Sequence, residues 1–354
     1  MKVLCAMSGG VDSSVAALEL LAAGHHVVGV TMRLWGGDSD TGCCSIADVD
    51  DARRVAQQLG IDHLVFNFTD DFDRHVVEPY VAAHAALVTP NPCIECNRHL
   101  KFDRLAARAE VLGFNAVATG HHARVVERGG RRYVARGADI AKDQSYVVHM
   151  LSQRDLERTL FPVGHLTKAD VRARAAAAGL RTATKPDSQD VCFITSASGD
   201  GRARFLGARI PFHRADVVDR AGQRLGDVEA VELVTIGQRR GIGLAGGGPK
   251  RYVVDVERGA EGGSATVVVG EDHDLDDDVL CVGDVVWSGG PVEGAVLVQC
   301  SAHGAARPAD CTATGAGTIE LRWHLPQRRI APGQSVVLYD ASDELVLGGG
   351  IARR

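Results

Sequence analysis

The sequence predicts an α/β fold that begins with a doubly wound parallel sheet and continues into a small β-rich middle domain and a C-terminal β-barrel. Strand and helix signals alternate through the first part, short strand-like segments follow, and the last part is strand-like throughout. We therefore expect three domains, at residues 1–196, 197–272 and 273–354, with the acidic stretch 271–278 as a solvated junction.

The first half opens with an apolar run at residues 3–7 that predicts a buried strand, followed by helix-forming residues 15–22 that end at Gly24. Ligands of parallel sheets bind beyond the carboxyl ends of the strands, which is where the loop after this strand would lie. Ser152 and Thr167 are expected helix caps. The other elements expected here are strands at 26–32, 63–66 and 116–118, and helices at 46–59, 76–87, 100–112, 153–160 and 168–178.

The second half lacks long helical patterns. Its middle part contains short β-branched runs separated by turn residues, at 215–219, 252–256 and 265–269. Its last part predicts further strands at 279–287, 318–323, 335–339 and 345–351, which are typical of a small all-β barrel.

The loop after the first strand reads SGGVDSS over residues 8–14. Gly9 and Gly10 allow the backbone to approach a ligand, and the helix that follows would direct N–H groups and a partial positive charge at an anion. The serines add hydroxyl donors, and Asp12 could hold the Mg²⁺ that accompanies a nucleotide. The loop lacks the Gly-Lys-Ser/Thr ending of a Walker A motif. A plainer interpretation is a strand-to-helix turn capped by Ser or Asp.

This SGGxDS pattern resembles the pyrophosphate loop of the ATP pyrophosphatase (PP-loop) superfamily, whose fold is adenine nucleotide hydrolase-like. The resemblance implies an enzyme that cleaves ATP between the α- and β-phosphates and activates a carbonyl oxygen with the AMP half. The motif indicates which class of nucleotide is bound but does not identify the substrate that is activated.

A Cys-x-x-Cys at Cys93 and Cys96 and a third cysteine, Cys192, are the chemically interesting thiols. We expect two prolines to keep the segment before Cys96 non-helical, so that Cys96 stands at a helix N-terminus. Such a position, followed by basic residues, lowers a thiol pKa. The motif also fits a redox pair, two zinc ligands or, with Cys192, an iron–sulfur site with one open iron. Packing is the expected role of Cys5, Cys43, Cys44, Cys281, Cys300 and Cys311.

Together, TPNPCIECN at residues 89–97, QDVCFI at 189–194 and the loop at 8–14 resemble the tRNA-specific 2-thiouridylases (MnmA/TrmU family). The resemblance covers nearly the whole chain. Its further landmarks are residues 118–121, 142–146, 161–164, 236–241, 332–335 and 347–351.

The family resemblance implies ATP-dependent adenylation of the C2 oxygen of the wobble uridine, followed by sulfur transfer. Cys192 would carry a persulfide, and Cys96 would act as the nucleophile that leaves a Cys96–Cys192 disulfide. Asp12 would take part in catalysis and hold Mg²⁺. The implied ATP contacts are Ala6, Met7, Ser8, Gly9, Gly10, Val11, Asp12, Ser13, Ser14, Met32 and Gly120.

The same resemblance implies a set of tRNA contacts, with the target base extruded from its stack. They are Asn91, Pro92, Cys93, His121, Lys142, Asp143, Gln144 and Gln334. A basic hairpin at 124–136 either contacts phosphates or is a solvated charged turn. Two positions depart from the family: Cys93 replaces an aspartate found in part of it, and Ala302-His303-Gly304 stands where many relatives carry an Arg-Tyr contact.

Composition supports a soluble globular protein, with 45% hydrophobic and 24% charged residues and a net charge of −6 that argues against indiscriminate nucleic-acid binding. We expect a cytoplasmic monomer without a membrane segment. Its expected partners are tRNAs for Lys, Glu and Gln, and a cysteine desulfurase or sulfur-relay protein. The alternatives are an iron–sulfur-dependent thiolase, a cluster-holding RNA-binding sensor, and a PP-loop ligase or amidotransferase in which the cysteines are unrelated.

Overall fold

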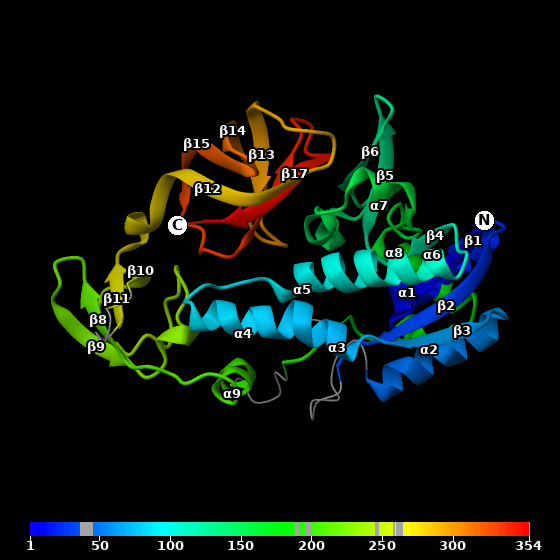
Figure 1. Ribbon diagram of the computed structural model, residues 1–354, viewed down its shortest axis with the longest axis horizontal. Coiled ribbons are helices and arrows are strands. Elements are labelled where there is room, and N and C mark those ends of the chain that lie inside the picture. Colours follow the sequence, from blue (N-terminus) through cyan, green and yellow to red (C-terminus); the bar gives the residue numbers. More distant parts are fainter. Residues whose placement is uncertain are drawn as a thin grey trace.

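A five-stranded parallel sheet forms the first part of the chain, as predicted (Figure 1). The computed structural model describes residues 1–35, 45–187, 191–194, 200–244, 248–257, 259 and 265–353; Cys43, Cys44 and the start of the QDVCFI motif lie outside them. In the order β3-β2-β1-β4-β7, the strands are β3 (His63–Asn67), β2 (His26–Arg33), β1 (Lys2–Ala6), β4 (Ala116–Ala118) and β7 (Thr159–Leu160).

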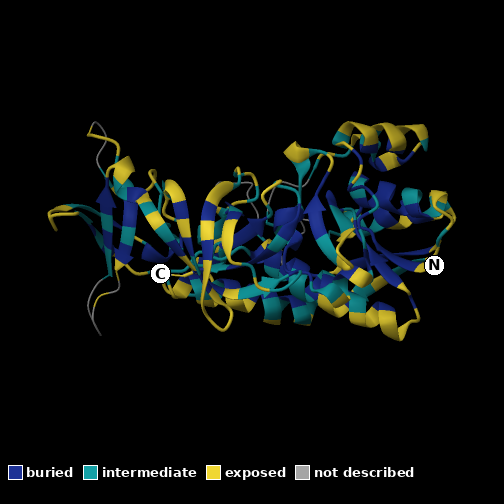
Figure 2. Ribbon diagram, turned by 90° about the horizontal axis from the view of Figure 1, so that it is seen from above, coloured by how far each residue is buried: buried dark blue, intermediate teal, exposed yellow. Residues whose placement is uncertain are grey.

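Helices cover both faces of this sheet because β1 is apolar on both faces. Val3 and Cys5 pack with α1 (Val11–Ala22), α2 (Ile46–Leu59) and α8 (Lys168–Ala177). Leu4 and Ala6 pack on the opposite face, against the helical segments at 69–85 and 92–111. Successive side chains of a strand point to opposite faces, so this alternation makes the sheet doubly wound. Figure 2 shows the strands buried and the outer sides of the helices exposed.

One helical segment begins earlier than predicted, and this changes the position of Cys96. The segment comprises α5 (Pro92–Glu95), the π-helical η2 (Cys96–Arg104) and α6 (Leu105–Val111). Asn91 caps it by accepting a hydrogen bond from the Cys93 N–H at 3.1 Å. Proline is tolerated at the first helical position because that N–H has no partner within the helix. The expectation of a non-helical segment up to Cys96 is therefore wrong, and Cys96 lies inside the helix.

Two other helices also differ from prediction. The segment expected at 76–87 starts at Thr69 and consists of α3 (Thr69–Phe72), η1 (Asp73–Val77) and α4 (Glu78–Ala85). The helix expected at 153–160 ends early as α7 (Gln153–Glu157), after a capping box between Ser152 and Asp155. The residues that follow it pair with β4 and become β7, so a tertiary contact overrides the local helical preference.

The middle part is a four-stranded sheet with a small core of its own, in which Val217, Val253 and Val267 are fully buried. It follows the short helix α9 (Gly201–Gly207). Its strands, in the order β10-β11-β8-β9, are β10 (Tyr252–Glu257), β11 (Ala265–Gly270), β8 (Ala215–Asp219) and β9 (Arg224–Val228).

The last part is a closed six-stranded barrel, as predicted. Its first strand starts at Asp276, so the end of the acidic stretch expected as a solvated junction is β structure instead. In barrel order, the strands are β12 (Asp276–Trp287), β15 (Thr318–Arg328), β14 (Arg307–Gly315), β13 (Gly294–Gln299), β16 (Ser335–Tyr339) and β17 (Val346–Ala352). Among the described helices, none has the length and apolar character needed to cross a bilayer.

The basic hairpin, β5 (Ala123–Arg128) and β6 (Arg131–Arg136), stands beside the barrel (Figure 1). Its arginines pair with acids of the turn between β16 and β17: Arg124 with Glu344 at 3.0 Å, Arg128 with Asp340 at 3.2 Å, and Arg136 with Asp343 at 2.6 Å. These ion pairs favour an interdomain structural role over phosphate binding for the three arginines.

Arg136→Met is expected to destabilise the protein by about 3–5 kcal/mol, because it leaves a buried carboxylate uncompensated. The Arg136 side chain is 9% exposed and also donates to Asp143 at 2.8 Å. Arg128→Met is the matched control; Arg128 is 64% exposed, so a loss of no more than about 1 kcal/mol is expected. Urea unfolding would measure both, and equal losses would contradict the assignment.

Candidate functional site

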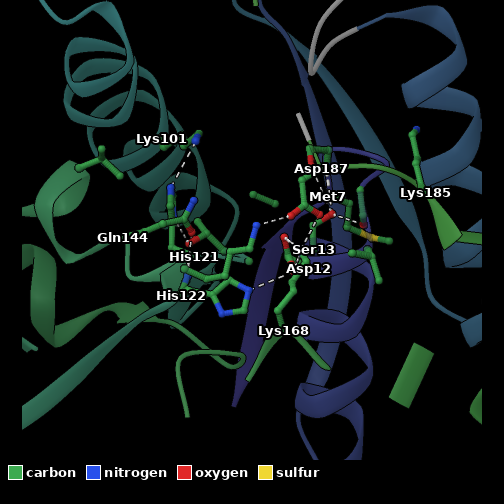
Figure 3. Close-up of a pocket in the computed structure, with 18 of the residues that line it drawn as sticks. Met7, Asp12, Ser13, Lys101, His121, His122, Gln144, Lys168, Lys185 and Asp187 are labelled. Atoms are coloured by element: carbon green, nitrogen blue, oxygen red, sulfur yellow. Dashed lines mark hydrogen bonds and ion pairs between the residues drawn. The ribbon is translucent and has the colours of Figure 1, made fainter. Parts of the chain in front are cut away.

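A cavity of about 510 Å³ lies at the carboxyl ends of β1, β2 and β4, where a parallel sheet binds its ligands (Figure 3). It brings together most of the residues predicted to bind ATP with four of those predicted to contact tRNA. Ala302 and His303, from the barrel loop that departs from the family pattern, also reach it. The predicted residues lining it are Ala6, Met7, Ser8, Gly10, Val11, Asp12, Ser13, Met32, Gly120, His121, Lys142, Asp143 and Gln144.

The glycine-rich loop ends at Gly10, the N-cap of α1, which has no side chain to cap the helix. A turn capped by Ser or Asp is therefore ruled out. The Ser13 and Ser14 hydroxyls instead donate to the Gly10 carbonyl, at 3.0 and 2.8 Å. The serines thus brace the loop, and the first-turn N–H groups and the positive end of the helix dipole face the cavity as an anion site.

Two glycines permit close backbone contacts around this loop. Gly9 has a φ of +74°, and a Cβ there would lie 2.3 Å from the Asp48 carbonyl oxygen. A Cβ on Gly120, in the turn after β4, would lie 2.6 Å from the Ser13 nitrogen. Only glycine lets these segments meet without displacing backbone. Gly9 and Ser14 therefore support the loop on the side away from the cavity, whereas the Gly120 backbone packs directly against the loop.

Gly120→Ala is expected to weaken ATP binding by about 5- to 150-fold, because overpacking against backbone costs about 1–3 kcal/mol. Isothermal titration calorimetry with ATP would measure the change. The control is Gly248→Ala, whose Cβ would meet nothing within 4 Å. An unchanged Kd for the Gly120 variant would show that the loop can shift without cost.

Asp12 lies at the centre of an ionic network (Figure 3). Lys168 donates to both Asp12 carboxylate oxygens, at 2.7 and 2.8 Å, and His122 Nε2 lies 3.1 Å from one of them. Burial alone would raise the pKa of Asp12, but the hydrogen bonds from His122 and Lys168 outweigh it and lower that pKa. Asp12 is therefore a carboxylate at neutral pH.

The predicted role of Asp12 as a Mg²⁺ ligand stays a prediction, and a cation there would compete with Lys168 for the carboxylate. Lys168 already neutralises both of its oxygens. The described residues contain no group of three or more His, Cys, Asp or Glu side chains placed to hold a metal ion. Those residues include Cys93, Cys96 and Cys192, so the side chains predicted as iron–sulfur ligands are not gathered into a cluster site either.

Lys168 also contacts Asp187 at 2.8 Å, and Lys142 approaches the other Asp187 oxygen at 2.9 Å. Burial acts to raise the pKa of Asp187, but the hydrogen bonds from Lys168 and Lys142 lower it to about 2. The loop, helix α8 and the segment before Cys192 are thus joined through one ammonium group.

His121 is buried, and its Nδ1 lies 2.7 Å from Thr119 Oγ1 while its Nε2 lies 3.5 Å from Lys101 Nζ. Burial and the nearby Lys101 charge hold the pKa of His121 well below its usual value. The ring is therefore neutral, and because Lys101 can only donate, the Nδ1–H points at Thr119. Gln144 accepts from the His122 N–H at 2.8 Å.

Asp143 and Gln334 make structural contacts that prediction did not foresee. The Asp143 side chain is 5% exposed and is bound by Arg136 and by the Ser145 hydroxyl. Asp143 also lines the cavity, so its contact with tRNA stays a prediction. Gln334, on the barrel, donates to the Thr89 carbonyl at 2.6 Å and ties the barrel to the start of the 92–111 helical segment.

The described residues that line the cavity do not include the three cysteines. Cys93 is exposed, Cys96 is 8% exposed and Cys192 is half-buried. Cys96 and Cys192 belong to the same apolar cluster on the opposite face of the sheet from α1. Their pairing as a disulfide stays a prediction.

Burial makes three other cysteines unreactive. It raises the pKa of Cys5 and Cys300 to about 12 and that of Cys311 to about 11. Thiols of that kind stay protonated at neutral pH and are poor nucleophiles. This agrees with the expected packing role of all three.

Several site residues were missed by the sequence predictions. Lys168 is one for which a signal existed: it is the first residue of α8, where the helix dipole disfavours a cation, so its presence there suggests another role. The others are Lys101, His122, Lys185, Asp187 and His303.

Comparison with known proteins agrees with this architecture. Residues 1–196 match a family model described as a tRNA methyl transferase HUP domain, residues 203–271 a tRNA methyl transferase PRC-barrel domain, and residues 277–352 an aminomethyltransferase beta-barrel domain. A tRNA-specific 2-thiouridylase MnmA from Mycobacteroides abscessus is 47% identical over 100% of both chains.

The chain belongs to the tRNA-specific 2-thiouridylase family. Another member, from Herpetosiphon aurantiacus, is 43% identical over 99% of this chain and 97% of its own. A crystal structure of a 4-thiouridine synthetase–RNA complex with bound ATP aligns with 54% of this chain and 44% of its own, at 21% identity and a TM-score of 0.38.

Proposed function

We propose that this protein is an ATP-dependent tRNA sulfurtransferase that converts the wobble uridine to 2-thiouridine, releasing AMP and pyrophosphate. The observation that carries the proposal is the anion-binding loop at 8–14, which opens into a cavity shared with His121 and Gln144 in a 2-thiouridylase-family chain.

In the first step, ATP binds at residues 6–14, with Met32 and Gly120 against the nucleotide. The N-terminus of α1 and Lys168 face the phosphates, where positive charge stabilises the charge that develops on the leaving pyrophosphate. The uridine C2 oxygen attacks the α-phosphorus, the bond to pyrophosphate breaks, and the oxygen becomes part of AMP, a good leaving group.

Sulfur transfer then requires two thiols. The terminal sulfur of a Cys192 persulfide attacks C2 and expels AMP, which leaves the uridine joined to Cys192 through a disulfide. The Cys96 thiolate then attacks the Cys192 Sγ and breaks the S–S bond between Cys192 and the uridine. The electron pair of the broken bond goes to the uridine sulfur, and a Cys96–Cys192 disulfide forms. An external thiol reduces this disulfide before the next turnover.

The tRNA is proposed to lie across the helical segment that begins after Asn91 and the barrel, with the flipped uridine in the cavity. Asn91, Pro92 and Cys93, which do not line the cavity, would contact the tRNA around the flipped base from outside it, and Lys142 and Gln144, which line the cavity, would contact the base itself. The proposed partners are tRNAs for Lys, Glu and Gln and a cysteine desulfurase or sulfur-relay protein that loads Cys192.

Thiolation in vitro tests the proposal. Purified protein, ATP with Mg²⁺, unmodified tRNA for Lys, cysteine and a cysteine desulfurase would be combined, and thiolated tRNA detected by its retardation in a mercury-containing gel. The expected result is an ATP-dependent shift. A shift only after anaerobic iron–sulfur reconstitution would replace the persulfide steps with cluster chemistry. Under both conditions, lack of a shift would contradict the function and favour a PP-loop ligase.

A further inference from the structure

Four of the described lysines line the cavity, and three of them are neutralised by aspartates. The three pairs are Lys142 with Asp187 at 2.9 Å, Lys168 with Asp12 at 2.7 Å and Lys185 with Asp48 at 2.6 Å. The fourth lysine is Lys101, from the π-helical η2, and no carboxylate among the described residues lies within ion-pair distance of it. Lys101 therefore brings an uncompensated positive charge to the cavity.

A neutral histidine holds the Lys101 ammonium group in place. Lys101 Nζ lies 3.5 Å from Nε2 of His121, and Nδ1 of the same ring lies 2.7 Å from Thr119 Oγ1. Both His121 and Thr119 are buried. Burial and the Lys101 charge hold the pKa of His121 well below its usual value, so the ring accepts from the ammonium group without opposing its charge. A carboxylate in this position would also hold the lysine but would neutralise it.

Lys101 stands at the end of the cavity where the target base is proposed to bind. Figure 3 shows it on the same side as His121 and Gln144, apart from Asp12 and Asp187. Asp12 belongs to the first turn of α1, so the anion site of the loop lies on its side of the cavity. Of the three phosphates of ATP, the α-phosphate must reach from this anion site toward the base, because the uridine oxygen attacks its phosphorus. The α-phosphate is therefore the anion expected beside Lys101.

We propose that Lys101 is a catalytic residue that contacts the nonbridging oxygens of the α-phosphate during its transfer to the uridine. The inference rests on the proposed function. In that reaction the uridine C2 oxygen bonds to the α-phosphorus, and the bond from this phosphorus to the pyrophosphate oxygen breaks. The electron pair of the broken bond leaves with pyrophosphate, and the N3 proton of the uridine passes to water. A fixed, uncompensated cation stabilises the α-phosphoryl oxygens most strongly in the transition state, so its contribution appears in kcat.

Exchange of ³²P-labelled pyrophosphate into ATP tests this role, because it reports adenylation and needs no sulfur donor. The assay contains the full-length protein, saturating ATP with Mg²⁺ and unmodified tRNA for Lys. Lys101→Met, which keeps most of the side-chain volume, is expected to slow the exchange by about 10²–10³-fold, the usual effect of losing one preorganised group at a reacting centre. Lys101→Arg retains the charge and should recover part of the rate. In calorimetry, the Kd of Lys101→Met for the α,β-methylene analogue of ATP should change by less than about tenfold, because the contact strengthens in the transition state.

Arg104→Met is the matched control. Arg104 lies on the same η2 segment, donates to Asp71 at 2.9 Å and does not line the cavity, so its exchange rate should stay within about threefold of the wild type. An unchanged exchange rate in Lys101→Met, or a loss of analogue affinity as large as the loss of rate, would overturn the inference. A weaker and less salt-dependent affinity for tRNA with normal exchange would also overturn it, because Lys101 would then contact a tRNA phosphate. Lack of exchange in the wild type would instead contradict the proposed function.

Discussion

Cys96→Ser and Cys192→Ser are each expected to lower the thiolation rate by roughly 10⁴-fold or more, which is the usual effect of removing a catalytic nucleophile. The two variants should block the thiolation reaction at different steps. Cys192→Ser cannot accept a persulfide, so cysteine labelled with ³⁵S should leave no label on that position. Cys96→Ser still accepts it but cannot resolve the disulfide between Cys192 and the uridine.

The Cys96→Ser variant should therefore accumulate a covalent protein–tRNA adduct that survives denaturation and is released by dithiothreitol. Non-reducing denaturing gels with labelled tRNA would detect it. Cys281→Ser is the control, because Cys281 is an exposed thiol that belongs to strand β12 of the barrel and does not line the cavity. Near-normal thiolation by Cys96→Ser would contradict the two-thiol mechanism, and an adduct in Cys192→Ser would reverse the assigned roles.

Where a local pattern decides the structure, the sequence was sufficient. The helix expected at 46–59 has those bounds, because an amphipathic run lies between the Ser45 cap and Gly60 in the left-handed conformation. The glycine-rich loop was predictable for the same reason. Pro92 misled the prediction, since its effect depends on the helix beginning at that residue, where proline is harmless.

Features that depend on distant residues were not predictable from one sequence. Lys168 and Asp12 are 156 residues apart, and nothing in either segment names the other as its partner. Residues Thr159–Leu160 form a strand only because they pair with β4. Asp143 was expected to contact tRNA, but its ion pair with Arg136 and its hydrogen bond from the Ser145 hydroxyl could not be predicted from the sequence.

Lys168→Met is expected to reduce kcat/KM for ATP by about 10²–10³-fold, the usual effect of losing one preorganised charge at a reacting phosphate. Methionine keeps most of the side-chain volume but removes the cation between Asp12 and Asp187. The two carboxylates would then repel each other and the incoming phosphates. Steady-state thiolation at varied ATP concentration would measure the loss.

The control for this substitution is Arg174→Met, on the same helix, whose guanidinium pairs with Glu19 on α1, outside the cavity. Its effect should stay within about threefold, as for an exposed ion pair worth less than 1 kcal/mol. Lys168→Arg retains the charge and should recover part of the activity. If Lys168→Met keeps wild-type kcat/KM, Lys168 merely compensates Asp12 and the phosphates are neutralised by another group. If the loss falls on KM and leaves kcat unchanged, Lys168 binds the ground-state phosphates as tightly as the transition state.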